Sequence, residues 1–181
     1  MPRLHAANSN VSGLPVTIYS DDVCPWCYIG KRRFETALAA PGMPRELAIS
    51  WRPFELNPDM PDAGMERAAY RAQKFGADKS AQLDQQMMET GREAGIHFAF
   101  DKMKRTPNTR LAHRLIWQAE REGMDAQNAL VNGLFKAYFE EGADIGNRDA
   151  LLGFAKEAGL DEKGAKVALH DDASLEAVLD L

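Results

Sequence analysis

Hydrophobic residues near the N-terminus fall in two short runs that a helical pattern separates. Residues 16–20 form a nearly continuous hydrophobic run of strand length, which is typical of a strand buried on both faces. Residues 47–52 form a second β-like run. Between them, residues 25–40 carry apolar side chains on one helical face, and Pro41 and Gly42 end that helix. A strand, a crossover helix and a second strand predict two parallel neighbours, because such crossovers are short and right-handed.

Beyond residue 61 the pattern changes to helical periodicity. A loop at residues 54–61, which follows one proline and contains two more, marks the boundary. Helices are predicted over residues 62–76, 81–94, 108–122, 125–141, 147–158, 161–170 and 172–181. Residues 95–100 are short and alternating but lie between helices, so we expect a loop there. Large apolar residues with helical spacing are expected in the core: Met87, Met88, Leu111, Leu115, Ile116, Leu130, Leu134, Phe135, Tyr138 and Phe139.

Composition and charge exclude several classes of protein. The chain has 181 residues, of which 45% are hydrophobic and 27% charged, as expected for one globular domain, alone or with a large insertion. No apolar stretch approaches the length of about 18 residues that a transmembrane helix needs, so we expect no membrane partner. The net charge is −5 without a basic block, which argues against a nucleic-acid partner.

The N-terminal residues and the cysteine count indicate a reducing compartment. Residues 1–13 are polar and small and lack the apolar core of a signal peptide, so we expect a flexible leader and a cytoplasmic location. The chain has only two cysteines, which is too few for a disulfide scaffold. In the cytoplasm, two such cysteines stay reduced unless they cycle between redox states.

The two cysteines form the sequence Cys24-Pro25-Trp26-Cys27 at the junction of the first strand and the first helix. A strand followed by CxxC and a helix is typical of a thioredoxin-like redox motif. The spacing places both sulfurs on one side of a helical turn, where they can close a disulfide. The helix N-terminus lowers the pKa of a thiol, so we expect Cys24 to attack. Cys27 lies a turn inside, and we expect it to be more buried and to resolve the mixed disulfide.

Other interpretations of the motif remain open at this stage. The pair could be half of a zinc site, although no second CxxC and no closely spaced histidine pair exists, so we expect no metal. The two cysteines could also be unrelated buried residues. Asp21 and Asp22 would oppose a thiolate by charge repulsion, or they are solvated loop residues. Trp26 offers a hydrophobic contact to a partner, or it simply begins the helix. His113 is expected to be structural.

Several segments in order resemble the DsbA-like thiol oxidoreductases, and most closely their cytoplasmic FrnE-like branch. The segments are SDDVCPWCYIGKRRFE, ISWRPFELNPDMP, TPNTRLAHRL, LFKAYFEEGADIGN and LLGFAKEAGLD. The branch is related to the 2-hydroxychromene-2-carboxylate isomerases and the kappa-class glutathione transferases. The resemblance covers residues 14–181 and implies an α/β, thioredoxin-like fold with a large helical insertion. It also implies a flexible leader at 1–13, a thioredoxin-like half at 14–61, the insertion at 62–160 and a return to the first half at 161–181.

The resemblance also implies how the site would work. Cys24 would be the nucleophile and Cys27 the resolving thiol, with Pro25 and Trp26 contacting substrate. No bound cofactor is expected, since the redox-active group is the Cys24–Cys27 disulfide, and glutathione would be a co-substrate at most. Partners would be protein or small-molecule thiols and disulfides. Related isomerases and transferases typically carry serine at the position of Cys24, so the CPWC sequence favours the oxidoreductases.

One feature departs from the family pattern. Members continue into a cis-proline segment, two strands and a closing helix, whereas the last proline of this chain is Pro107. We therefore expect the C-terminal strands to be missing and the strand at 16–20 to have an unpaired edge. Such an edge favours pairing with another chain, so a homodimer through it is one expectation. The alternatives to a thiol–disulfide oxidoreductase are a glutathione-dependent isomerase or transferase and a non-catalytic binding or chaperone module.

Overall fold

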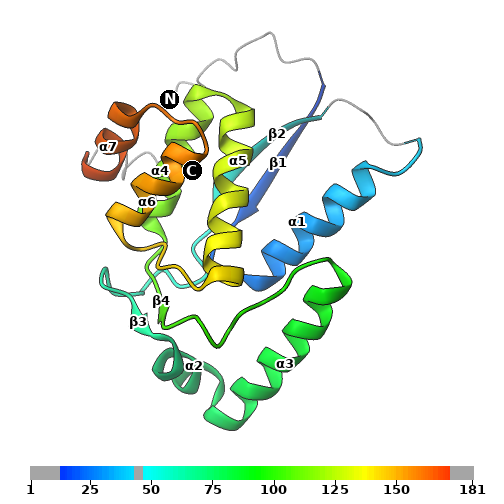
Figure 1. Cartoon of the computed structure of the whole chain (residues 1–181), viewed down its shortest axis with the longest axis vertical. Coiled ribbons are helices and arrows are strands. Elements are labelled where there is room, and N and C mark those ends of the chain that lie inside the picture. The colour runs from blue at the N-terminus through cyan, green and yellow to red at the C-terminus, as the bar shows by residue number, and fades with distance from the viewer. Residues whose placement is uncertain (1–12, 43–46, 172–181) are drawn as a thin grey trace, which may run out of the picture.

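The computed structural model describes residues 13–42 and 47–171 (Figure 1). A strand–helix–strand unit comes first and contains β1 (Leu14–Ser20), α1 (Pro25–Leu38) and β2 (Leu47–Pro53). A helical segment follows, with β3 (Met65–Glu66), α2 (Arg67–Phe75), α3 (Ala77–Glu93), β4 (Arg105–Thr106), α4 (Arg110–Glu122), α5 (Met124–Lys136), the π-helix η1 (Ala137–Glu141), α6 (Arg148–Glu157) and α7 (Glu162–His170). Nearly all of the predicted leader and the predicted helix at 172–181 lie outside the described residues.

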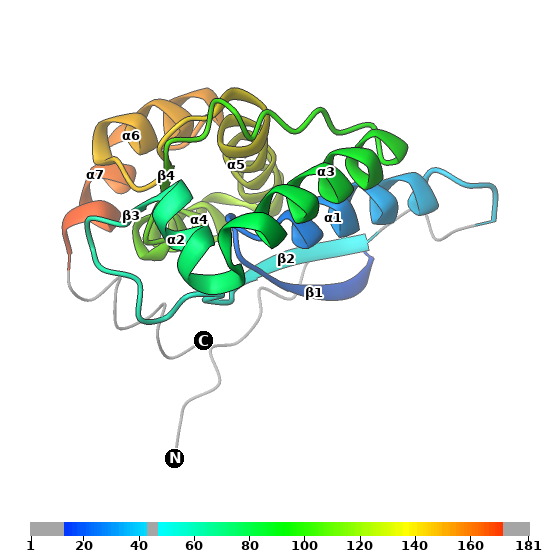
Figure 2. The same ribbon diagram turned by 90° about the horizontal axis from the view of Figure 1, so that it is seen from below.

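The two strands of the first unit are parallel neighbours, which confirms the sequence prediction. Their register runs from Leu14 opposite Leu47 to Ser20 opposite Pro53. Helix α1 makes the crossover, and Figure 2 shows α1 and α3 on one side of the two strands. On the other side of β2 along the sheet lie α4 and α5, which contact it. The carboxyl ends of both strands therefore point toward the start of α1.

The prediction that the first strand is buried on both faces is wrong. Leu14 is 59% exposed and Tyr19 is 60% exposed, whereas Ser20 at the end of β1 is buried. The reason is that β1 pairs with β2 alone within the described ranges, and α1 covers only one face. Exposure therefore remains high as far as Tyr19, and only Ser20, at the strand end that precedes the CxxC sequence, is buried.

The helix predicted to begin at Asp62 begins five residues later, at Arg67. Residues before it form the short antiparallel pair of β3 with β4, which the sequence analysis did not predict. Gly64 has a φ of +66°, and a Cβ there would lie 2.7 Å from the backbone oxygen of Thr106. The side chain of Glu66 then caps α2 by accepting hydrogen bonds from the backbone N–H groups of Ala68 and Ala69.

Other predicted helices are confirmed with shifted ends. The helix predicted over 81–94 begins earlier, at Ala77, directly after Gly76. The single helix predicted over 125–141 is α-helical only to Lys136 and continues as the π-helix η1. A backbone hydrogen bond of 2.9 Å from Ala143 to Ala137 lies at the end of this wider turn, in which Tyr138 and Phe139 are both buried. Within the described ranges, no helix is long and apolar enough to cross a bilayer.

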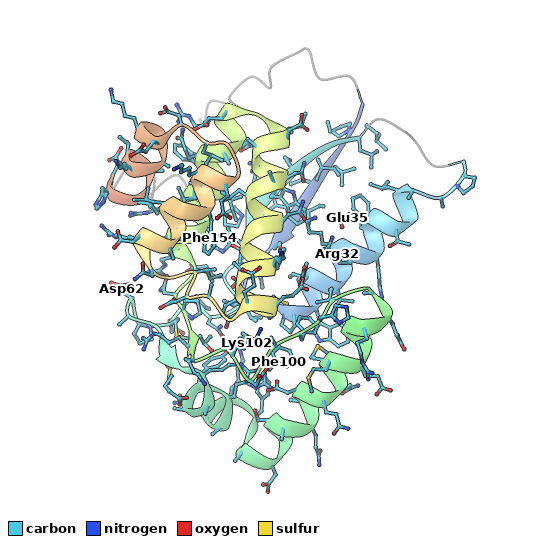
Figure 3. The ribbon with its side chains drawn as sticks, viewed as in Figure 1. Arg32, Glu35, Asp62, Phe100, Lys102 and Phe154 are labelled. Atoms are coloured by element: carbon cyan, nitrogen blue, oxygen red, sulfur yellow. The ribbon has the colours of Figure 1, made fainter. Side chains whose placement is uncertain are left out.

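The core lies in the helical segment and extends to the start of α1. Tyr28 stacks on Phe135 with ring centroids 5.0 Å apart, and its hydroxyl donates to Glu140. Arg32 and Glu35 lie on the same helix, where their side chains are 3.3 Å apart (Figure 3). The loop predicted at 95–100 is confirmed and contributes three buried side chains, namely Ile96, Phe98 and Phe100. Most predicted core residues are buried, but Leu111 is only partly so, and Met88 is exposed because it lies on the outer side of α3.

Candidate active site

The CxxC sequence begins helix α1 directly after the loop that follows β1, as predicted. Cys24 is the N-cap residue, with extended backbone angles (φ −92°, ψ 110°), and Pro25 occupies the first helical position. The backbone N–H of Cys24 donates to Asp21 over 3.0 Å, which closes a turn, and Cys27 donates to the carbonyl of Cys24 over 3.1 Å. Proline suits this position because a helix leaves its first N–H groups unpaired. The backbone N–H groups of Trp26 and Cys27 in this first turn act to lower the pKa of Cys24.

The two thiols are reduced in this structure. The interaction between the two thiol side chains is the largest cause that lowers the pKa of Cys27 to about 6. The same interaction, together with burial, raises the pKa of Cys24. Sequence analysis placed the lower pKa on Cys24 and expected Cys27 to be more buried. In the structure both residues are partly buried to a similar extent, so the expected greater burial of Cys27 is not confirmed, and the two thiols share one proton. The pair holds one thiolate near neutral pH.

The surroundings of Cys27 act on its pKa in opposite directions. Burial raises the pKa, and so does the carboxylate of Asp21. The backbone of Asp21 and the hydroxyl of Ser20, which lie near the sulfur, act to lower it. Cys27 also lines a mainly apolar groove of about 290 Å³ between β1 and α1, together with Ile18, Tyr19, Ser20, Gly30, Lys31, Phe34 and Trp51.

Pro25 and Trp26 lie on different sides of the motif. Trp26 is 54% exposed, so its ring is accessible beside the two thiols. Pro25 instead faces the helical segment, where it lines a small cavity of about 50 Å³ that Arg67 and Tyr138 also line. The start of α1 is therefore covered by helical-segment side chains on one side and open at Trp26 on the other.

Asp21 is fully buried, which corrects the interpretation of Asp21 and Asp22 as solvated loop residues. One carboxylate oxygen of Asp21 accepts the backbone N–H of Leu56 over 2.6 Å, and the other accepts that of Val23 over 3.4 Å. Thr109 in front of α4 adds a further hydrogen bond. Burial raises the pKa of Asp21, while these bonds and the neighbouring His113 lower it. Asp21 thus joins the loop before Cys24 to the loop after β2 and to the helical segment.

His113 on α4 is the partner that links Asp21 to the helical segment. Its Nε2 atom is 3.8 Å from an Asp21 oxygen, and only 1% of the residue is exposed. Burial lowers the pKa of His113, although the charges of Asp21 and Glu55 and a hydrogen bond to the Phe54 backbone act against this. The expectation of a structural histidine agrees with this position. No sequence signal indicated its contact with Asp21, because the two residues lie far apart along the chain.

Asp22 is also buried, with 2% exposure, but it has different surroundings. Its Oδ2 atom accepts no hydrogen bond from the part of the chain that the structure describes. Burial raises its pKa well above the usual range for a carboxyl group, and the charges of Asp21 and Cys27 raise it further. The sequence analysis missed Asp22 as a site residue. The only available signal was an acidic pair directly before a CxxC sequence.

The described residues contain no group of three histidine, cysteine or acidic side chains placed to hold a metal ion. Asp21, Asp22 and His113 instead surround the base of the CxxC turn as hydrogen-bonding and titrating groups. Two sulfurs that share one proton at a helix N-terminus can carry out thiol–disulfide exchange.

Comparison with known proteins identifies the family to which this arrangement is similar. Residues 15–180 match the family of DSBA-like thioredoxin domains. A crystal structure of a probable DsbA oxidoreductase from Streptomyces coelicolor, SCO1869, is 27% identical, with a TM-score of 0.81 over 92% of this chain and 72% of that chain. The uncharacterized protein YwbO of Bacillus subtilis (strain 168) is 29% identical over 86% of this chain and 71% of its own length.

A third structure shares the fold at lower identity. The cytosolic disulfide reductase DsbM from Pseudomonas aeruginosa, solved with GSH, is 20% identical over 92% of this chain and 77% of that chain, with a TM-score of 0.62. This likeness concerns the fold alone. Together with the family match, it confirms the expected α/β thioredoxin-like fold with a helical insertion.

Proposed function

The chain belongs to the family of DSBA-like thioredoxin domains, and on that premise we propose that it exchanges disulfides through Cys24 and Cys27. The observation that carries the proposal is the placement of two free, partly buried thiols at the first turn of α1, with Cys24 as the N-cap residue. A thiolate is the attacking form in disulfide exchange, and this pair supplies one at neutral pH. The pair also has the spacing that an intramolecular disulfide requires.

In the proposed reaction, Cys24 attacks first and Cys27 resolves. Cys24 lies at the N-cap beside the exposed ring of Trp26, whereas Cys27 lies within α1, in the groove behind β1. The proton that the two sulfurs share moves to Cys27, and the Cys24 thiolate attacks a substrate disulfide. One substrate thiolate leaves, and a mixed disulfide with Cys24 remains. Cys27 then attacks the Cys24 sulfur, the second substrate thiol leaves, and the protein keeps the disulfide.

The remaining site residues have supporting roles in this proposal. Pro25 and Trp26 contact the substrate, with the Trp26 ring as an exposed apolar surface next to the sulfurs. The substrates are protein or small-molecule thiols and disulfides. Glutathione serves as the thiol that reduces the protein again, and the reaction takes place in the cytoplasm. Support comes from the FrnE-like motifs and from DsbM, a cytosolic disulfide reductase of similar fold that was solved with GSH.

We also propose that the helical insertion at 62–160 shapes the approach to Cys24, while residues 14–61 and 161–181 belong to the thioredoxin-like half. A homodimer through the exposed edge of β1 is part of this proposal, because β1 pairs with β2 alone among the described strands. Light scattering tests the dimer directly, and a strictly monomeric chain would contradict it.

Two matched variants test the exchange scheme. Cys27→Ser keeps the attacking thiol and loses the resolving one, so it should trap disulfide-linked adducts on non-reducing gels, while Cys24→Ser should not. Both variants should lose insulin-reducing activity in the presence and absence of glutathione. Equal adducts from both variants would contradict the assigned order of attack. An insulin-reducing double Cys→Ser variant would contradict the proposed function. Glutathione-dependent activity that needs neither cysteine would favour the isomerase or transferase alternative.

A further inference from the structure

The two edges of the small parallel sheet differ in how they are covered. The outer edge of β2 is closed by Gln127, whose side chain accepts the backbone N–H of Trp51 over 2.9 Å and donates to the Trp51 carbonyl over 3.1 Å. The edge of β1 pairs with no further strand in the described part of the chain. Natural proteins usually protect such an edge with charged residues, but the sequence of β1, LPVTIYS, contains none. The edge of β1 is therefore suited to pairing with another strand.

The backbone groups of β1 alternate between its two edges. Ser20 faces β2, because its carbonyl accepts the N–H of Phe54 over 3.1 Å. Every second residue of a strand turns its N–H and C=O groups to the same side, so Pro15, Thr17 and Tyr19 present theirs at the open edge. These three residues lie symmetrically about Thr17, which is the middle residue of the strand. An antiparallel copy of the same strand can consequently meet the open edge with matching backbone groups.

We propose that β1 of a second copy pairs antiparallel with this edge about a two-fold axis at Thr17, so that Leu14 of one copy lies at the groove beside Cys27 of the other. This register uses all seven residues of β1. It opposes Thr17 to Thr17 and Pro15 to Tyr19, and because proline lacks an N–H, only the Tyr19 N–H donates in the second pair. The inference rests on the homodimer of the proposed function and adds its register and the residue that it brings to the site.

The same register covers the apolar groove. Opposed residues of antiparallel strands have their side chains on the same face of the sheet. Ile18 and Ser20 line the groove of about 290 Å³ together with Cys27, so the residues opposite them, Val16 and Leu14 of the second copy, border it as well. Leu14 is 59% exposed in the single chain, and pairing would remove it from water. The second copy would thus complete the wall of the groove next to the resolving thiol.

Engineered cysteines test the register in a chain whose two native cysteines are changed to serine. Thr17→Cys places two thiols opposite each other, where the Cα atoms of a hydrogen-bonded pair are about 5.5 Å apart, a distance that a disulfide spans. This variant should give disulfide-linked dimers on non-reducing gels. Val16→Cys and Ile18→Cys should not link to themselves but should link to each other when the two variants are mixed, because they are direct neighbours across the axis. The exposed Lys163→Cys variant on α7 is the control and should not link.

A charge at the axis tests the interface independently. Thr17→Lys sets two ammonium groups against each other, so the dimer should dissociate to monomers in light scattering. Gly153→Lys on α6, where a Cβ meets nothing within 4 Å, is the charge-matched control and should remain dimeric. In the Cys24→Ser background, Thr17→Lys should also raise the rate of Cys27 alkylation by iodoacetamide about fivefold, because Leu14 of the second copy no longer covers the groove.

The possible outcomes separate the register from the dimer and from the chemistry. A monomeric wild type would overturn both the inference and the homodimer. A dimer in which Thr17→Cys fails to link, or Val16→Cys links to itself, would overturn the register, and unchanged Cys27 alkylation in monomeric Thr17→Lys would overturn the role of Leu14. If Thr17→Lys fails to fold, the cross-linking pattern decides. Failure of disulfide exchange would contradict the proposed function alone, because the cross-links form without the native cysteines.

Discussion

The strand–helix–strand unit and the helical segment bury their side chains to very different extents. In β1, exposure remains high up to Tyr19. In α5, Leu130 and Leu134 are fully buried and Phe135 stacks on Tyr28. The unit that carries the cysteines therefore depends on the helical segment for its packing. Tyr28, next to Cys27, shares the core of that segment, as do Ile29 and Trp51.

This difference indicates that stability and chemistry are concentrated in separate regions. The buried apolar side chains of the helical segment supply most of the hydrophobic stabilisation. The junction of β1 and α1 instead buries two carboxylates and a histidine, which costs free energy. A costly polar cluster persists where a well-packed region supports it. The contact between Asp21 and His113 connects the two regions.

Matched truncations in the two regions give the largest expected effect. Leu130→Ala removes a fully buried side chain from α5 and should lower the free energy of unfolding by about 2–5 kcal/mol. Ile18→Ala removes a partly buried side chain from β1 and should cost only about 1 kcal/mol. Urea denaturation of both variants measures the difference. Equal losses would show that the strand–helix–strand unit contributes as much to stability as the helical segment.

The features that sequence analysis predicted correctly depend on local pattern. The parallel strands, the helix start at Pro25 and the apolar stripe of α5 follow from residues close together in the chain. The pair of β3 and β4 has two residues in each strand. The close approach of Gly64 to Thr106 and a backbone hydrogen bond from Arg67 to Lys104 help to position it. Nothing in a local pattern indicates such a contact.

In the candidate site, too, only the features that follow from local sequence were predictable. The two cysteines and their place on the helix followed from CxxC spacing. The burial of Asp21 and Asp22 did not, because charged neighbours in a loop normally remain solvated. For Asp21 it depends on the backbone N–H of Leu56 in the loop after β2 and on the side chain of His113 in α4. The spacing of the two cysteines also does not indicate which sulfur keeps the proton that they share.

The effect of His113 on the free energy of unfolding should depend on pH. Burial lowers the pKa of His113 below its ordinary value of 6.5, so the unfolded chain takes up a proton there before the folded chain does. Proton uptake by His113 in the unfolded chain therefore lowers the free energy of unfolding as the pH falls through 6.5, and it has no effect above that value. The difference in the free energy of unfolding between the wild type and the less stable His113→Gln variant should therefore become smaller as the pH falls.

Urea denaturation at a series of pH values measures this effect, and the exposed His97→Gln variant is the matched control. The pKa values of Asp21 and Asp22 are raised, and this has the opposite effect. Protonation of these two groups raises the free energy of unfolding as the pH falls. The comparison between wild type and His113→Gln reports on His113 together with Asp21, because the charge of His113 is one of the causes that lower the Asp21 pKa. If the difference in the free energy of unfolding between wild type and His113→Gln stays constant with pH, His113 is not a neutral, buried histidine.

The surface of the helical segment should show the smallest effect. Lys166 and Glu162 form an ion pair one turn apart on α7, and both side chains are largely exposed. Exposed pairs of this kind are screened by water and salt, so Lys166→Gln should change the free energy of unfolding by less than about 0.5 kcal/mol. The remaining difference should vanish in about 1 M salt, where charges are screened within about 3 Å. A loss above about 1 kcal/mol that persists in salt would mean that surface charge, as well as the buried core around Leu130, holds the helical segment together.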